Sequence, residues 1–194
     1  EERKENTWEM LLTFPMKAWE LVAGKFLASL AFFAVTLAST LTVPAMLFYL
    51  GDPDNGAVFA GYFGTLLLGA YFLSIGIFFS GFYKDQIIAF VITLLVCFGI
   101  FLVGTNFIAT FIDGNIPGLG SLLMELVGLS DHYESFTRGV VELADILYFA
   151  AWTAVFLLLN VLFIDIRSRP NARLYFSATV AVCVVIGLLG NWLV

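Results

Sequence analysis

The sequence predicts an all-α protein, a polytopic transmembrane helix bundle with an N-terminal amphipathic helix and an extracytoplasmic re-entrant helical hairpin. Composition is the first observation that predicts it. Hydrophobic residues make up 61% of the 194 residues, charged residues only 12%, and the mean hydropathy is +0.97. These values lie far outside those of a soluble domain. The second observation is that five apolar stretches are each long enough to cross about 30 Å of hydrocarbon as a helix.

The first 25 residues differ from the rest of the chain because charged and apolar positions alternate with a helical period. Apolar residues recur at three- and four-residue steps at Trp8, Leu11, Leu12, Pro15, Trp19, Val22 and Phe26. Such spacing places them on one side of a helix. Asn6 can cap a first short helix, and Pro15 both ends it and suits the first turn of the next. We expect a short helix, a kink and a longer helix that enters the bilayer.

The five predicted spans are residues 26–50, 57–83, 86–112, 146–164 and 174–194, and each is free of Asp, Glu, Lys, Arg and His. If the N-terminal segment is cytoplasmic, every basic residue of the chain except Arg138 lies on the cytoplasmic side. Two short turns, GDPDNG and FYKDQ, join the first three spans.

The external segment, residues 113–145, is too apolar for a free loop and too interrupted for a span. Its two halves are each long enough for a short helix, with Ser130 or Asp131 available as a cap between them. Two helices that dip back into the outer leaflet would shield the intervening backbone. A small surface cap is the alternative.

Packing residues are also visible within the spans. Glycines at Gly61, Gly64, Gly69, Gly76 and Gly81 would allow close packing along one helix. Helix-to-helix hydrogen bonding is the expected role of the polar residues Asn106, Asn160 and Asn191. Cys97 and Cys183 lie in apolar runs and are expected to be buried free thiols.

The order of residues in ERKENTWEMLLTFP resembles the cytoplasmic coupling segment of the permease subunits of type-2 ABC transporters. The positions that fall on that pattern are Glu2, Arg3, Thr7, Glu9, Leu11, Leu12, Thr13, Pro15, Gly24 and Lys25. Asn6 stands where the family usually has glycine, a mild departure because Asn also suits a turn. The stretch FTRGVVELADILYF, residues 136–149, resembles the segment before a late span in the gliding-motility and exporter-like subgroup.

This resemblance implies residues 1–25 as cytoplasmic coupling helix and elbow, and 26–166 as permease core. Residues 167–194, a basic linker and an additional transmembrane helix, lie beyond the position where the six-span family ends; this helix would be an added anchor or the beginning of a fused extracytoplasmic partner. It also implies an interface with the ATPase subunit at Arg3, Lys4, Thr7, Trp8, Glu9, Leu11, Leu12 and Thr13. The re-entrant segment would include Phe136, Arg138, Gly139 and Asp145. By the same resemblance, two further spans would precede Glu1, so we expect an N-terminally truncated permease.

The expected partners are a cytoplasmic ABC ATPase subunit, a second permease copy or homologous permease, and membrane lipids. A multi-pass protein of the bacterial cytoplasmic (inner) membrane is implied, with its N-terminal segment cytoplasmic. The chain has no P-loop of the form GxxxxGK[ST], so ATP and Mg would be bound by the partner and no cofactor by this chain. Nucleic-acid binding would need a basic patch that the sequence lacks.

The sequence gives little support to catalysis. The sole histidine, His132, has no motif around it, so we predict no catalytic, cofactor-binding or metal-binding residues. An ion-coupled carrier would need an ionisable residue in a span, and none of the predicted spans has one. The predicted function is therefore a permease subunit, without an ATPase site, that serves export or mechanical work across the envelope. The alternative is a membrane anchor or scaffold without transport, whose N-terminal helix binds the lipid surface.

Overall fold

The computed structural model describes residues 18–83, 85–115, 118, 120 and 128–167. Within these residues the only regular elements are helices, which confirms the all-α prediction. They are α2 (Ala18–Ser39), α3 (Thr42–Leu50), α4 (Asn55–Phe82), α5 (Gln86–Val103), α6 (Asn106–Asn115), α8 (Leu129–Thr137) and α9 (Leu143–Arg167). Four helical segments are long and apolar enough to cross a membrane. The predicted N-terminal coupling helix and the predicted fifth span lie outside the described residues.

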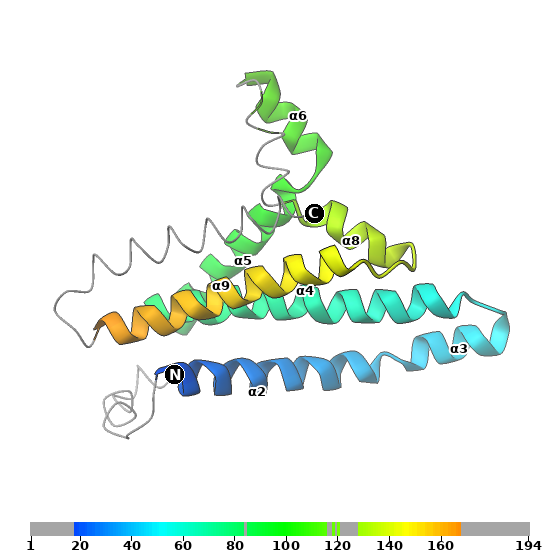
Figure 1. Ribbon diagram of the computed structural model, residues 1–194, viewed down its shortest axis with the longest axis horizontal. Helices are drawn as coiled ribbons and strands as arrows, with labels where there is room; N and C mark the ends of the chain where they lie inside the picture. Colours follow the sequence, from blue (N-terminus) through cyan, green and yellow to red (C-terminus); the bar gives the residue numbers. More distant parts are fainter. Residues whose placement is uncertain (1–17, 84, 116–117, 119, 121–127, 168–194) are drawn as a thin grey trace.

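The bundle is organised around α4, which packs against α2, α5, α8 and α9 (Figure 1). Helices α4 and α9 run in the same direction, while α2 and α5 run in the opposite one. Helix α6 extends away from the other helices. We call the end where α3 meets α4 the α3–α4 end, and the end where α4 meets α5 the α4–α5 end.

The helix of the first span is broken. It begins at Ala18, in keeping with the expected helix that starts near Pro15 and enters the bilayer, so Glu20 and Lys25 belong to the same helix as the apolar run. A break at Thr40 and Leu41 then separates α2 from α3. Pro44 explains this break, because proline lacks the N–H that would bond the Thr40 carbonyl four residues earlier.

Tyr62 of α4 replaces that missing hydrogen bond. Its hydroxyl donates to the Thr40 carbonyl oxygen at 3.0 Å and lies 3.1 Å from the Thr40 hydroxyl. The Val43 N–H also donates to this carbonyl, at 3.0 Å. The kink is therefore held against α4 by a side chain from the neighbouring span.

The turns between the first three spans form through aspartate caps. At the start of α4, the Asp54 side chain accepts a hydrogen bond from the Gly56 N–H at 2.8 Å. Asp85 does the same for the Ile87 N–H at the start of α5, at 2.9 Å. Asp at these positions satisfies amide groups that have no partner within the helix. Both GDPDNG and FYKDQ thus act as the short connections that were predicted.

The third span ends earlier than predicted. Helix α5 ends at Val103, and α6 is a separate helix that begins at Asn106, so residues 104–112 do not continue the span to residue 112. A close approach lies at the break, because a Cβ on Gly104 would be 3.0 Å from the backbone nitrogen of Leu129. Asn106 accordingly begins a separate helix rather than lying within the span.

The fourth span begins at Leu143 rather than at residue 146, and therefore includes Asp145. Helices α9 and α2 thus extend beyond the predicted charge-free spans, and ionisable residues lie in their first turns. The carboxylate of Asp145 is buried, with only 3% of the residue exposed.

We predict that Tyr62→Phe, which removes only a hydroxyl, will weaken the attachment of the α2–α3 kink to α4. The loss of one hydrogen bond should lower the free energy of unfolding by about 0.5–1 kcal/mol. Unfolding of the purified protein in detergent by increasing SDS measures this change. Tyr49→Phe is the matched control, because Tyr49 is 97% exposed, and an equal loss in both variants would contradict the assigned role of Tyr62.

Candidate functional site

The best-defined candidate site is the contact of α8 with α4 and α9, which contains three of the residues predicted for the re-entrant segment, Phe136, Gly139 and Asp145. Gly139 lies against the first turn of α4, where an added Cβ would be 3.0 Å from the Ala57 nitrogen. Leu129, at the other end of α8, belongs to the same buried cluster as Tyr71 of α4. At ~1.5 Å per residue, Tyr71 is about 24 Å along α4 from Asn55. Helix α8 therefore lies beside the first half of a membrane span, not beyond its end.

Phe136 is the central packing residue of α8. It is fully buried, and its ring lies over Gly64 of α4. A Cβ at Gly64 would be 2.6 Å from Phe136 Cγ and 2.7 Å from its Cβ, so only glycine allows this approach. The same ring is 6.2 Å from Phe149 of α9, measured between centroids. Phe136 thus fills the space where α4, α8 and α9 meet.

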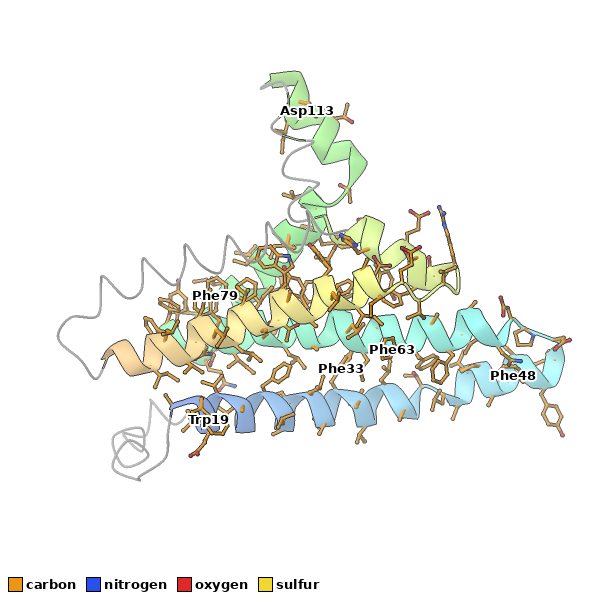
Figure 2. The ribbon with its side chains drawn as sticks, in the orientation of Figure 1. Trp19, Phe33, Phe48, Phe63, Phe79 and Asp113 are labelled. Atoms are coloured by element: carbon orange, nitrogen blue, oxygen red, sulfur yellow. The ribbon has the colours of Figure 1, made fainter. Side chains whose placement is uncertain are left out.

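A second glycine of α4 receives a ring from the opposite side. Phe33 of α2 points toward α4 (Figure 2), and a Cβ at Gly69 would overlap the Phe33 ring. Two glycines five residues apart point in directions roughly 140° apart on a helix, at about 100° per residue. Helix α4 therefore holds α2 on one side and α8 on another through ring-over-glycine contacts.

Two adjacent residues of α8 make hydrogen bonds to different neighbours. The Tyr133 hydroxyl is 3.1 Å from the Thr65 hydroxyl of α4. His132 Nδ1 lies 2.7 Å from Asp145 Oδ1 of α9. The His132 ring also stacks on Tyr148 at a centroid distance of 4.1 Å. Helix α8 is therefore joined to both parallel spans by polar side chains.

The polar contact with α9 is only partly satisfied. Asp145 Oδ2 and the Tyr148 hydroxyl are both buried and have no hydrogen-bond partner among the described residues. A buried polar group without a hydrogen-bond partner lowers the stability of the fold. The His132–Asp145 pair is therefore weak evidence for stability and stronger evidence for a fixed arrangement of α8 and α9. The His132–Asp145 contact consequently acts to position α8 on α9.

The other predicted residues of this segment differ in position. Arg138 is exposed and pairs with Glu134 one turn earlier, at 2.5 Å, so it does not join the buried contact. Gly139 adopts a φ of +81°, which glycine tolerates best. Helix α8 is preceded by Gly128 as its N-cap, so the expected cap at Ser130 or Asp131 is wrong. The first half of the predicted hairpin lies largely outside the described residues, and the hairpin remains a prediction.

The chemistry available around His132 is limited. Among the described residues, the His132 ring is hydrogen-bonded only to Asp145, and no hydroxyl or thiol is placed on it as a nucleophile. The described part of the chain also holds no group of three His, Cys, Asp or Glu side chains that could bind a metal. The sequence did not identify three residues of this site: His132, Tyr133 and Tyr148. Each has its partner on another helix, 13 or more residues away in the sequence.

The eight residues predicted to contact an ATPase subunit, between Arg3 and Thr13, lie outside the described residues. The structure does place the helix that follows them. Helix α2 starts at Ala18, and Val22 in its second turn is the one buried residue of the helix. The coupling pattern thus leads directly into a helix that packs on α4 and α9.

We predict that Gly64→Ala will lower the free energy of unfolding by about 1–3 kcal/mol, because the new methyl group overlaps the base of the Phe136 side chain. Gly61→Ala is the matched control one turn away, where nothing lies within 4 Å of the new Cβ. Thermal unfolding of both variants in the same detergent measures the difference. Equal stability of the two variants would contradict the Phe136 contact.

We predict that His132→Phe will be destabilising by about 3 kcal/mol, because it leaves the buried Asp145 carboxylate without its partner. The double variant His132→Phe, Asp145→Leu should recover most of this loss, since two apolar side chains replace a partly satisfied polar pair. A double-mutant cycle on unfolding in SDS tests the coupling. Additive effects of the two substitutions would show that the pair is not coupled.

Comparison with known proteins supports the same family that the coupling pattern indicates. Residues 1–191 match the family model described as ABC-2 family transporter protein. No match was found among curated proteins or among solved structures. The family match covers nearly the whole chain, including the N-terminal pattern and all four described spans. The chain therefore belongs to the ABC-2 transporter family, whose members are membrane permeases of ABC transporters.

Proposed function

We propose that this chain couples ATP hydrolysis by a separate ATPase subunit to export, or to mechanical work across the envelope as in gliding-motility systems. The observation that carries the proposal is the direct continuity between the coupling pattern and α2, within a chain of the ABC-2 transporter family. Three residues after Pro15, the proline of that pattern, the chain is already helical at Ala18–Ser39. ATP and Mg are held by the partner subunit in this proposal.

Residues 6–13 would form the short helix that sits in a groove of the ATPase. Trp8, Leu11 and Leu12 supply the apolar anchors, and Arg3, Lys4 and Glu9 the polar rim, as interface energetics favour. Thr7 and Thr13 flank these anchors. When the ATPase subunits close, this segment moves and carries the start of α2 with it.

Helix α2 is suited to transmit that movement. It has 22 residues without interruption, which is roughly 33 Å at ~1.5 Å per residue. The Phe33 ring seats it on Gly69, about halfway along α4, and Tyr62 holds its far end. A displacement at Ala18 is thus passed to α4 and, through Gly64 and Phe136, to α8.

Charge distribution supports a cytoplasmic α4–α5 end. Lys25 lies near the start of α2, and Arg167 ends α9 at the same end of the bundle. The α3–α4 end carries Asp52 and Asp54. Basic residues mark cytoplasmic flanks of membrane spans, so we propose an inner-membrane protein with a cytoplasmic N-terminal segment. A second permease copy or a homologous permease would complete the transporter.

The test is co-purification of the complete protein in detergent with its candidate ATPase. We predict that the wild type captures the ATPase and that Glu9→Lys, Leu12→Asp loses it, because the double variant reverses a rim charge and adds a charge to an apolar anchor. The matched control is Glu142→Lys, Leu143→Asp, which makes the same changes at exposed positions of the other end.

Capture should persist in this control, with equal amounts of all variants in the membrane fraction. Equal capture by the wild type and the Glu9, Leu12 variant would contradict the assigned interface. Absence of capture by any form would favour a membrane anchor or scaffold.

A further inference from the structure

Helix α5 presents a large apolar face that no described element covers. It is the most apolar of the described candidate spans, and Ala89 is its only buried residue. Its exposed bulky side chains are Ile87, Ile88, Phe90, Val91, Leu94, Leu95, Phe98 and Phe101. Within this set Ile87, Val91, Leu94, Phe98 and Phe101 follow alternating steps of four and three residues. This is the spacing of a seam between two helices, and contact with lipid alone does not require it.

The end of α9 lies close to the start of α5. The ring of Phe82, at the end of α4, lies 4.1 Å from the ring of Phe163 near the end of α9. Helix α5 begins at Gln86, four residues after Phe82. Chain that continues beyond Arg167 therefore starts at the end of the bundle where α5 starts.

The sequence beyond Arg167 has the length to cover this face. Residues 168–173 form a short basic connection, and residues 174–194 are an apolar stretch of 21 residues without charge. Six extended residues reach about 20 Å, about twice the 8–10 Å between packed helices. As a helix, the apolar stretch would be roughly 31 Å long, compared with roughly 27 Å for α5.

We propose that residues 174–194 form a membrane-spanning helix that packs parallel to α5 and covers the seam defined by Ile87, Val91, Leu94, Phe98 and Phe101. The short connection keeps this stretch near α5 at high effective concentration, which favours it over a second copy of the chain. Ser177 and Ala181 form a small-xxx-small pair, which lets bulky side chains of a neighbouring helix approach closely.

Disulfide cross-linking in native membranes tests the proposal, with Cys183 as one fixed partner. Cys183 lies nine residues after Leu174, and Leu95 lies nine residues after Gln86, so the two are at the same depth if the helices are parallel. The test variant is Leu95→Cys, next to the seam, in the full chain with Cys97→Ala, and Leu94→Cys, on the seam itself, is a second variant. Oxidation should give an intramolecular cross-link, detected as a mobility shift of the monomer.

Two control positions have the same depth on other helices. Leu27 lies nine residues from the start of α2, and Leu158 nine residues before the end of α9. Both are exposed, at 61% and 51%, compared with 60% for Leu95. We expect at least a tenfold lower cross-linking yield for Leu27→Cys than for Leu95→Cys, and a lower yield for Leu158→Cys. All variants are compared at equal amounts in the membrane fraction.

Three results would overturn the proposal. Preferential intramolecular cross-linking at Leu27→Cys or Leu158→Cys would place residues 174–194 on another helix. A dimer band at Leu95→Cys would assign the α5 face to a second copy of the chain. No cross-link at either Leu95→Cys or Leu94→Cys would leave this face to lipid.

Discussion

The arrangement of the bundle depends on the close approach of aromatic rings to two glycines of α4. In a membrane the hydrophobic effect does not drive helices together, so packing contacts and hydrogen bonds must do so. Gly64 and Gly69 provide surfaces without side chains, and Phe136 and Phe33 occupy them. The two contacts differ in rigidity. At Gly64 the nearest atoms are the base of the Phe136 side chain, which cannot move without α8, whereas at Gly69 they belong to the outer part of the Phe33 ring.

This constraint links the two ends of the molecule. Helix α2 receives the N-terminal segment at the α4–α5 end, and α8 packs in the other half of α4. Tyr62, Tyr133 and His132 add hydrogen bonds across these helix contacts. In the function proposed above, in which a separate ATPase drives the permease, such a linked set of helices would convert movement at one membrane surface into movement at the other. The buried but incompletely satisfied Asp145 fixes α8 on α9 more than it adds stability.

Much of this fold follows from local features of the sequence. Apolar runs predicted four described spans, the short stretches GDPDNG and FYKDQ predicted the turns between them, and glycines in residues 57–83 predicted close packing. The helices extend past the apolar runs where ionisable residues adjoin them. Glu20 and Lys25 lie in the same helix as the first predicted span, and Asp145 lies in the helix of the fourth. Asp145 is tolerated at a buried position of α9 because α8 places its partner, His132, beside it. This contact joins two separate helices, and local hydropathy does not encode it.

The most direct test of the account is whether α2, α4 and α8 move as one unit. Spin labels at Trp19→Cys, at the start of α2, and Val140→Cys, just after α8, report the distance between the two ends in a chain without native cysteines. Both positions are more than half exposed, and dilution with unlabelled chain removes distances between copies. The account predicts one narrow distance distribution, unchanged between nucleotide-free and ATP-bound complexes with the ATPase. A second distance population that appears with ATP would contradict it, because α2 and α8 would then move independently.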